Sequence, residues 1–366
     1  MPRQTQAVNA LFQIIRAEAA AAGVLPFARF MELALYCPVH GYYETQKDNP
    51  GPRGDFFTSV NTGELFGQLL AFQFATWLEE IWTRQPSAPI FSLVEAGAHD
   101  GKLAADILAW LRSQRPQLLE RLEYLILEPS ARRQEWQRQT LKDFANVRWQ
   151  DPQLSLPGPP VTGVIFSNEL LDAMPVHRYG WDARNKKWFE WGVAVEGENF
   201  VWEKIHDPGF RLQNPELESV LPDGYIVETS PAAENWWRAA ADRLAHGKLL
   251  AIDYGHAPGD LFSPARTRGT LRAYFRHRLS DDLLANVGEQ DLTAHVDFAA
   301  IQTAGEAAGL TTENFLTQPQ FLTQILGTAM KDQSFGEWNA RRTRQFQTLT
   351  HPEHLGRAFR VLVQSR

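Results

Sequence analysis

The sequence predicts an α/β fold built on a doubly wound, mostly parallel sheet. Short apolar runs alternate with segments of helical periodicity from about residue 91 onward, which is typical of βαβ units. A glycine-rich turn follows the first apolar run, where such sheets connect a strand to a helix. Hydrophobic residues make up 44% of the 366 residues, which is enough for a sizeable core, so we expect one large domain that carries insertions.

The apolar patterns justify the elements in chain order. Residues 1–85 have mostly helical periodicity and predict an N-terminal helical cap, whereas residues 86–366 carry the sheet. Within the cap, a strongly apolar helix over residues 66–78 should be buried. The expected strands are short apolar runs: Phe91 to Glu95, Tyr124 to Leu127, Val147 to Trp149, Val161 to Phe166, Leu249 to Ile252 and Phe359 to Val363.

Two interruptions of the alternation predict insertions. From about residue 176 to 227, Trp-rich alternating stretches and turn residues predict an antiparallel ribbon. A second insertion, about residues 256–317, contains a basic stretch from Arg266 to Arg278 that is either a solvated face or a surface for an acidic partner. The ribbon could wall a small pocket, grip a protein or form an interface, so a homodimer stays open. The ribbon tryptophans expected to be exposed are Trp188, Trp191 and Trp202.

Composition excludes several classes of protein. The net charge of -7 argues against a nucleic-acid partner, which needs a basic face. Cys37 is the single cysteine, so there is no intrachain disulfide or cysteine-rich zinc site, and we expect no metal. No apolar run reaches the ~18 residues of a membrane span. The amphipathic stretch from Asn9 to Ala22 could be a transit peptide, but a packed helix is favoured, so we expect a cytoplasmic protein.

The first predicted strand ends in a turn that suits a ligand. Glu95 is followed by Gly97, Ala98 and Gly101, in the spacing Glu-x-Gly-x-x-x-Gly, before a helix begins. Glycines let the backbone approach a ligand, and a helix N-terminus offers free N–H groups. A tight turn without any ligand explains the same residues, so this motif is weak by itself.

Acidic residues follow the second and third strands. Glu128 ends the second strand, where a carboxylate can accept both hydroxyls of a ribose. The alternative is a charge at a helix N-terminus, because Pro129 and Ser130 follow. The glycine turn and Glu128 together favour an adenosine ligand. Asp151, after the third strand, either reaches an adenine amino group or is a solvated loop residue.

The fourth strand leads into a polar segment that contains Asn168, Glu169 and Asp172. Open α/β sheets bind ligands beyond the carboxyl ends of their strands, so this segment should face the same ligand. Buried carboxylates need partners, which predicts a polar or cationic substrate. Glu169 and Asp172 would share a face if the segment were helical. The alternative is a capping arrangement, with Asn168 as N-cap, that only orders the loop.

These residues belong to motifs that resemble the MidA-like methyltransferases almost end to end. The Gly-Asp-Phe and Asn-Glu-Leu-Leu-Asp-Ala blocks are the most specific of them. The shared motifs are Met31 to Tyr36, His40 to Tyr43, Gly54 to Ser59, Phe66-Gly67, Glu95-x-Gly97, Asn168 to Ala173, Val176 to Arg178, Asp253 to Gly255, Gly269 to Leu271 and Asp291 to Phe298. The resemblance implies a Rossmann-like methyltransferase with S-adenosylmethionine as cofactor. It also implies a protein acceptor, with arginine favoured, because the mitochondrial members that assist assembly of respiratory complex I are protein-arginine methyltransferases.

The strand-end positions and the resemblance together predict roles for the candidate residues. The expected cofactor-binding residues are Thr58, Ser59, Glu95, Gly97, Ala98, Gly101, Glu128 and Asp151, and the expected catalytic residues are Asn168, Glu169 and Asp172. In this assignment the N-terminal cap contributes Thr58 and Ser59 to the donor site, and the two carboxylates clamp a cationic guanidinium. Two departures lie near the donor site: His99 replaces the middle glycine of the turn, and Val60-Asn61 replace Pro-Glu.

Two other functions stay open at this stage. The chain could be a non-catalytic assembly factor that binds a partner protein, and His99 favours this hypothesis. It could also be a small-molecule methyltransferase. Three histidines, His177, His277 and His295, could act as bases but are more simply explained as structural residues.

Overall fold

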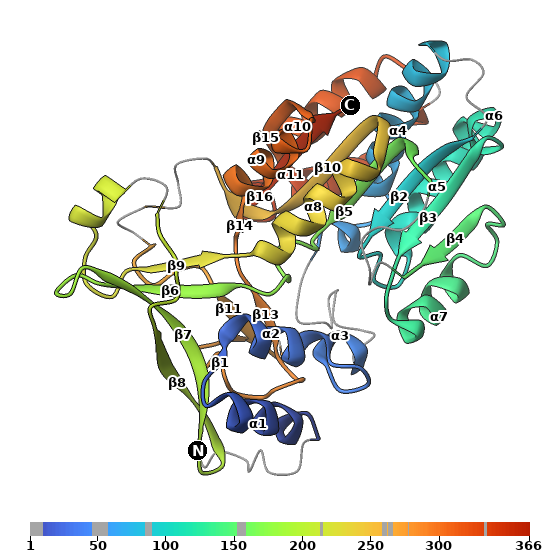
Figure 1. Cartoon of the computed structure of the whole chain (residues 1–366). Helices are drawn as coiled ribbons and strands as arrows, with labels where there is room; N and C mark the ends of the chain where they lie inside the picture. Colours follow the sequence, from blue (N-terminus) through green and yellow to red (C-terminus); the bar gives the residue numbers. More distant parts are fainter. Residues whose placement is uncertain are drawn as a thin grey trace. The chain divides into compact units, whose positions relative to one another are not determined.

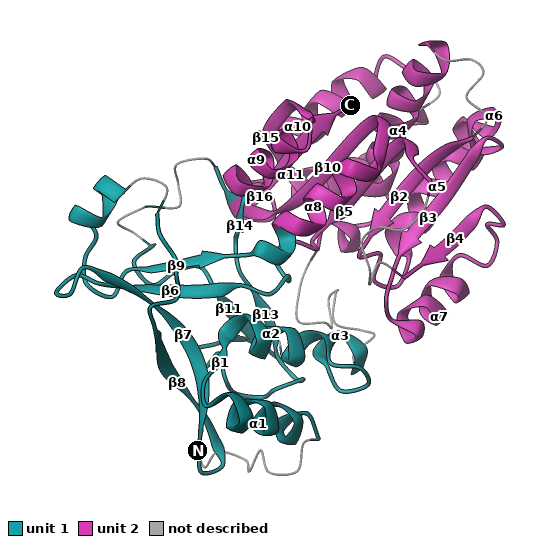
Figure 2. Cartoon of the chain, viewed as in Figure 1, with its two compact units in different colours: residues 1–49, 172–233, 256–297 teal, residues 50–171, 234–255, 298–366 magenta. Residues whose placement is uncertain are grey.

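The computed structural model describes residues 10–45, 58–84, 90–151, 159–212, 215–257, 262, 266–276, 278–332 and 335–366. Its contacts divide the chain into two compact units, shown in Figure 2. Unit 1 comprises residues 1–49, 172–233 and 256–297, and unit 2 comprises residues 50–171, 234–255 and 298–366. Each unit is therefore assembled from three separated stretches of chain. The boundaries expected for the cap and the insertions stay predictions.

Unit 2 is built on a mostly parallel sheet with the strand order β15-β16-β10-β5-β2-β3-β4 (Figure 1). From β10 to β4 all neighbours are parallel, whereas β16 is antiparallel to both β10 and β15. The strands are β2 (Phe91–Ala96), β3 (Leu122–Leu127), β4 (Val147–Gln150), β5 (Val161–Asn168), β10 (Leu244–His256), β15 (Thr311–Thr317) and β16 (Phe359–Ser365). The strand order reverses between β2 and β5, and ligands bind at such a switch point. The predicted doubly wound sheet is confirmed.

Helices cover both faces of this sheet. They are η2 (Ser59–Thr62), α4 (Leu65–Arg84), α5 (Lys102–Gln114), α6 (Pro116–Leu119), α7 (Ala131–Thr140), α8 (Pro231–Arg243), α9 (Phe298–Ala307), α10 (Gln318–Ala329) and α11 (Ala340–Thr350). On β16, Val361 and Val363 point into the cluster that holds α4 and α5. Gln364 points to the opposite face, where Trp237 of α8 donates a hydrogen bond to it at 2.7 Å.

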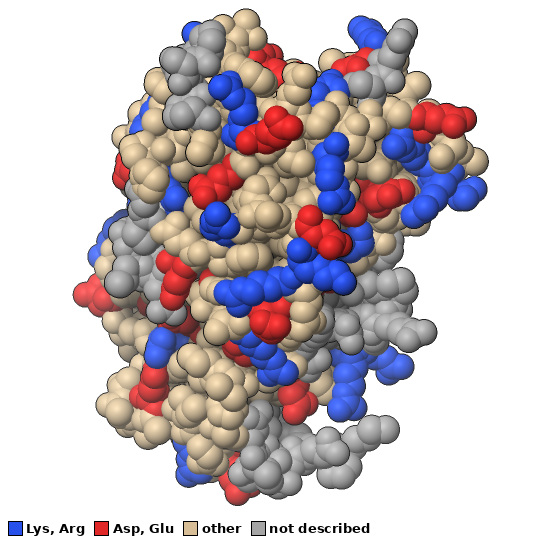
Figure 3. Space-filling view, turned by 90° about the vertical axis from the view of Figure 1, so that its right-hand side faces the viewer, with Lys and Arg blue, Asp and Glu red and all other residues tan. Residues whose placement is uncertain are grey.

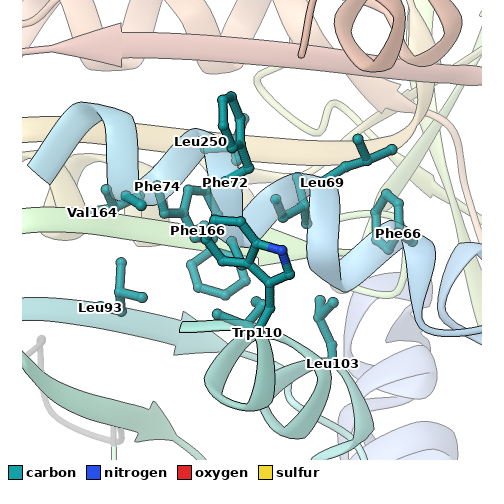
Figure 4. Close-up of a cluster of buried hydrophobic side chains, with 14 of the residues drawn as sticks. Phe66, Leu69, Phe72, Phe74, Leu93, Leu103, Trp110, Val164, Phe166 and Leu250 are labelled. Carbon is teal, nitrogen blue, oxygen red and sulfur yellow. The ribbon is translucent and has the colours of Figure 1, made fainter. Parts of the chain in front are cut away.

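The main core of unit 2 lies between α4, α5 and the centre of the sheet (Figure 4). The rings of Phe74 on α4 and Phe166 on β5 have centroids 4.9 Å apart. Both side chains are fully buried, and truncation of either to alanine would cost about 3–5 kcal/mol. This packing fixes the strand that leads into the polar segment after β5. The predicted burial of the apolar helix over residues 66–78 is confirmed.

Unit 1 combines helices with two small antiparallel sheets. One sheet has the order β1-β7-β6-β9, with β8 paired to β7, and the other has the order β12-β11-β13. The elements are α1 (Ala10–Ala22), β1 (Leu25–Pro26), α2 (Phe27–Tyr36), α3 (Tyr42–Thr45), β6 (His177–Asp182), β7 (Lys187–Glu196), β8 (Asn199–His206), η3 (Pro215–Ser219), β9 (Ile226–Thr229), β11 (Arg272–Phe275), β12 (Arg278–Ser280), β13 (Asp291–Thr293) and β14 (Val296–Asp297). These extra sheets confirm that the alternation of strands and helices is interrupted by insertions.

The amphipathic stretch at the start of the described chain forms the packed helix α1. Leu11, Phe12 and Ile15 are buried, and the ring of Phe12 lies 4.7 Å from that of Phe200 on β8. The favoured interpretation of this stretch as a packed helix therefore agrees with the structure.

The expectation that Trp188 is exposed is wrong. Its ring is 4% exposed, its Nε1 donates a hydrogen bond to Glu218 at 2.8 Å, and its centroid lies 5.1 Å from those of both Trp181 and Phe210. The segment that follows the ribbon covers this face of the sheet, which alternation alone cannot indicate. Trp191 and Trp202 are half-buried.

Three general properties follow from the described residues. No helix within the described ranges has both the length and the apolar character of a bilayer span. In the same part of the chain, no three His, Cys, Asp or Glu side chains are grouped so that they could hold a metal ion. On the face shown in Figure 3, acidic and basic side chains are interspersed.

Candidate active site

The turn after β2 is a sharp left-handed connection at the switch point of the sheet. Gly97 and Gly101 have φ values of +76° and +84°, which favour glycine. A Cβ atom at Gly97 would lie 2.9 Å from the Cδ1 of Leu170, so the turn packs closely against the loop after β5. Gly101 is the N-cap of α5, and its N–H donates to the carbonyl of Ala98 at 2.7 Å. Ala98 is buried, at 5% exposure.

Glu95 is a buried acid directly before this turn. It is 2% exposed, and the hydroxyl of Tyr124 on β3 donates a hydrogen bond to its Oε2 at 2.6 Å. Burial raises the pKa of Glu95 to about 7, although the bond from Tyr124 opposes the shift. A carboxyl group with this pKa changes its protonation state easily when a cation binds beside it.

His99 takes the left-handed conformation that a glycine would adopt easily. Its φ is +46°, an uncommon value for a residue with a side chain. The carbonyl of His99 accepts a hydrogen bond from Nε2 of Gln137 at 3.0 Å, and its Nδ1 lies 3.8 Å from Oδ1 of Asp100. The hydrogen bond from Gln137 thus accompanies the left-handed conformation of His99.

Glu128, after β3, is 1% exposed and makes several contacts within the protein. Its Oε1 accepts the backbone N–H of Ser130 at 3.0 Å, and its Oε2 accepts Nε2 of Gln137 at 3.1 Å. Arg133 lies 3.7 Å from Oε2. The contact to Ser130 is the helix N-terminal arrangement considered as the alternative to ribose binding.

The segment after β5 is a bend and a turn, not a helix. Asn168 is the last residue of β5 and therefore caps no helix, and Glu169 has a φ of +54°. The N–H of Glu169 donates to the carbonyl of Ile252 at 3.0 Å. Such strain in a non-glycine residue costs of order 1–3 kcal/mol and is concentrated at functional sites. The idea that Glu169 and Asp172 share a helix face is thus wrong.

Glu169 and Asn168 form a polar pair in this bend. Nδ2 of Asn168 donates to Oε1 of Glu169 at 3.1 Å, and the backbone N–H of Ser59 also donates to this carboxyl group. Burial raises the pKa of Glu169 to about 8, and the nearby charge of Asp253 acts in the same direction. Oδ1 of Asn168 is buried and has no hydrogen-bond partner among the described residues. A buried acceptor without a partner is costly and marks a place for a donor group.

The segment that contains Thr58 and Ser59 meets the same edge of the sheet. Ser59 is fully buried in η2, and its hydroxyl donates to Oε1 of Gln318 at 3.1 Å. Oγ1 of Thr58 accepts Nδ2 of Asn61 at 2.9 Å. The structure therefore brings Ser59 to Glu169. The preceding residues, 54–57, lie outside the described ranges.

Asp151 and Asp172 are the other two acids of the predicted set. Asp151 is exposed after β4. Asp172 is 7% exposed and belongs to unit 1, where its carbonyl accepts the N–H of Ala294 at 2.9 Å.

The histidines are tied into unit 1. Nδ1 of His177 lies 2.7 Å from Oε1 of Glu190. The N–H of His295 donates to Oγ1 of Thr270 at 3.0 Å, and its ring centroid is 4.6 Å from that of His256. His277 lies outside the described residues. These contacts are of the kind that structural histidines make.

Asp253 on β10 holds the segment after β5 in place, and the sequence analysis did not assign it a role. It is fully buried, and its Oδ2 accepts the backbone N–H groups of Leu170 at 3.1 Å and Leu171 at 2.8 Å. It thereby holds the bend that carries Glu169. The sequence signal for it is the Asp253-Tyr254-Gly255 motif, which comes at the end of a predicted strand.

Comparison with known proteins agrees with this geometry. Residues 73–316 match a family model described as "Putative S-adenosyl-L-methionine-dependent methyltransferase". A crystal structure from Burkholderia thailandensis, bound to S-adenosyl-homocysteine, is 34% identical to this chain. It superimposes with a TM-score of 0.83 over 98% of this chain and 92% of that one.

Curated relatives are more distant. The Drosophila melanogaster protein named "Protein arginine methyltransferase NDUFAF7 homolog, mitochondrial" is 27% identical over 97% of this chain and 84% of its own length. The Mus musculus protein named "Protein arginine methyltransferase NDUFAF7, mitochondrial" is 28% identical over 84% of this chain and 73% of its own length.

Proposed function

Because the chain belongs to the family of MidA-like, S-adenosyl-L-methionine-dependent methyltransferases, we propose that it methylates a protein side chain, with arginine the favoured acceptor. The family uses S-adenosyl-L-methionine as methyl donor. The Burkholderia thailandensis structure contains S-adenosyl-homocysteine, the product that remains after methyl transfer. The acceptor and the roles of individual residues are proposed. The observation that carries the proposal is the Asn168–Glu169 pair at the switch point of the sheet.

The chain offers groups that suit the donor. The turn at Gly97 brings the backbone close to the space beyond β2, and Ala98 and Gly101 continue it to the N-terminus of α5. The proposed contacts of the donor are Glu95 to its methionine end, Glu128 to its ribose, Asp151 to its adenine, and Thr58 and Ser59 over its open side. When bound, the donor supplies an electrophilic methyl group on a positively charged sulfur. Holding the acceptor in line with it can contribute roughly 7–11 kcal/mol.

The proposed work of Asn168 and Glu169 is to bind and aim a cationic acceptor. Oδ1 of Asn168 is a buried acceptor that a guanidinium N–H would satisfy. The high pKa of Glu169 means that its carboxyl group is mostly protonated at neutral pH before ligands bind. Cationic ligands would lower this pKa, because an opposite charge favours the ionised form. Asp172, three residues later in the chain, is the proposed second carboxylate of the clamp.

The test separates transfer from donor binding. Glu169→Gln and Asp172→Asn keep the shape of each side chain and remove its charge. A charged hydrogen bond contributes about 1.5–3 kcal/mol, so each variant should methylate about ten- to a hundredfold more slowly, with little change in the affinity for the uncharged S-adenosylhomocysteine. The assay uses radiolabelled donor and a lysate of cells that lack the protein. Glu135→Gln, on the exposed side of α7, is the matched control.

Each outcome discriminates between the candidate functions. A labelled protein band that fades with both variants but not with the control supports the clamp. Label that appears only in small molecules favours a small-molecule methyltransferase. If the wild type binds the donor and labels nothing, the result favours the alternative function of a non-catalytic assembly factor. If both variants label at the wild-type rate, these carboxylates are structural and the arginine proposal loses its physical basis.

A further inference from the structure

We infer that Gln137 on α7 is a positioning residue that fixes Glu128 and the turn after β2 relative to each other. It thereby presents the Glu128 carboxylate to the ribose hydroxyls of the donor. This inference rests on the proposed role of Glu128. Nothing in the sequence singles out Gln137, which lies in a strongly polar helix, yet its side chain is fully buried.

The amide of Gln137 joins two loops and a strand. Its Nε2 donates to the carbonyl of His99 at 3.0 Å and to Oε2 of Glu128 at 3.1 Å. Its Oε1 accepts Nε1 of Trp149 on β4 at 2.9 Å. The turn after β2, the acid after β3 and the third strand of the motif are thus connected through one planar group. Movement of any one of them would break a buried hydrogen bond.

The chemistry of the partners leaves one orientation for this amide. His99 offers a carbonyl and Glu128 a carboxylate, and both only accept hydrogen bonds. Trp149 offers an indole N–H, which only donates. A flipped amide would face two acceptors with its oxygen and a donor with its nitrogen. Among side chains of this length, only the glutamine amide offers two N–H donors on one side and an oxygen acceptor on the other. Glutamate or methionine at this position would lose both donated hydrogen bonds.

The backbone around Gln137 is also closely fitted. A Cβ atom on Gly101 would lie 3.4 Å from the Cα of Gln137, so the turn approaches the helix at this residue. The bond to the His99 carbonyl helps to hold a left-handed residue in place. Gln137 therefore stabilises the left-handed conformation that His99 takes.

The test uses two ligands that differ only in one hydroxyl: S-adenosylhomocysteine and its 2′-deoxy analogue. Calorimetry on the full chain should show that the wild type prefers the natural ligand by about tenfold. In Gln137→Met, S-adenosylhomocysteine should lose about tenfold more affinity than the analogue does, so that the preference falls below about threefold. Gln139→Met, an exposed glutamine two residues along the same helix, should retain the wild-type preference.

A second variant and a double mutant distinguish positioning from stability. Trp149→Phe removes only the bond that orients the amide and should reduce the preference about two- to threefold, even if Gln137→Met folds poorly. Adding Gln137→Met to Glu128→Ala should change the preference no further, because the two residues act as one unit. A merely structural Gln137 would weaken both ligands equally.

The possible outcomes distinguish failure of this inference, of the ribose role of Glu128 and of the proposed function. If the wild type discriminates and Gln137→Met discriminates equally well, the inference is wrong and the proposed donor site stands. If the wild type binds S-adenosylhomocysteine without discrimination, the ribose role of Glu128 is wrong and the inference is overturned with it. If the wild type binds neither ligand, the proposed function itself fails.

Discussion

From the proposed position of Glu169 beside the methyl group, its raised pKa predicts that binding of the methyl donor depends on pH. S-Adenosylmethionine carries a positive charge on its sulfur, and S-adenosylhomocysteine does not. A carboxylate beside the methyl group therefore favours the charged ligand, but only after it has lost its proton. With a pKa of about 8, ionising Glu169 at pH 7 costs about 1.36 × (8 − 7), or roughly 1.4 kcal/mol. This cost corresponds to about a tenfold change in affinity.

The expected result is a pH-dependent preference for the charged donor. The ratio of the two affinities should rise up to about tenfold per pH unit between pH 6 and 8 and level off above pH 8. In Glu169→Gln this slope should vanish. Calorimetry of both ligands, in two buffers of different ionisation enthalpy, measures the affinities and the proton released. Any titration of Glu95 cancels in the ratio if this residue contacts the part that both ligands share.

Two results would refute this reasoning. A wild-type ratio that stays constant from pH 6 to 9 would mean that Glu169 does not face the sulfur. A slope that persists in Glu169→Gln would mean that another group titrates. Glu135→Gln should behave as the wild type does, because that side chain is 61% exposed on α7.

Further predictions concern the turn, the acids and unit 1. His99→Gly should leave the affinity for the donor within about tenfold of wild type by calorimetry, and a gain of a hundredfold would mean that His99 obstructs the site. The folded-state pKa values of Glu95 and Glu169 lie above the unfolded value of 4.5, so the stability they contribute is complete below about pH 4.5 and is lost as pH rises toward 7 and 8. Urea unfolding should show a loss of up to about 1.4 kcal/mol per pH unit per group in this window, and the variant with glutamine at both positions should have a flatter profile. Gly269→Ala should lower the free energy of unfolding by about 1–3 kcal/mol, because Gly269 has a φ of +74° and its Cβ would collide with Glu228; an unchanged urea midpoint would contradict this.

The sheet was predictable from sequence because its strands are buried on both faces. Runs such as Leu249 to Ile252 are apolar without interruption, as central parallel strands require. Strand β15 was missed for the opposite reason. It lies at the edge, its sequence Thr-Thr-Glu-Asn-Phe-Leu-Thr is mostly polar, and much of it is accessible to solvent.

The candidate site was only partly predictable. The acids at Glu95, Glu128 and Glu169 stand at strand ends, where a sequence can place them. Gln137 and Asp253 act through bonds to backbone and side chains of other elements, and such contacts leave no periodic pattern. The left-handed bend at Glu169 was also hidden, because no glycine marks it.

The discontinuous make-up of the two units restricts how this protein can be cut and rearranged. Each unit draws on three stretches of chain that alternate along the sequence with those of the other. No continuous segment of the gene therefore encodes one unit alone, and proteolysis at one site could not release a complete unit. To exchange unit 1 between relatives in the laboratory, three separate segments of the chain have to be replaced together. In evolution, too, the small sheets of unit 1 can diverge freely only while every crossing point into the donor-binding sheet is preserved.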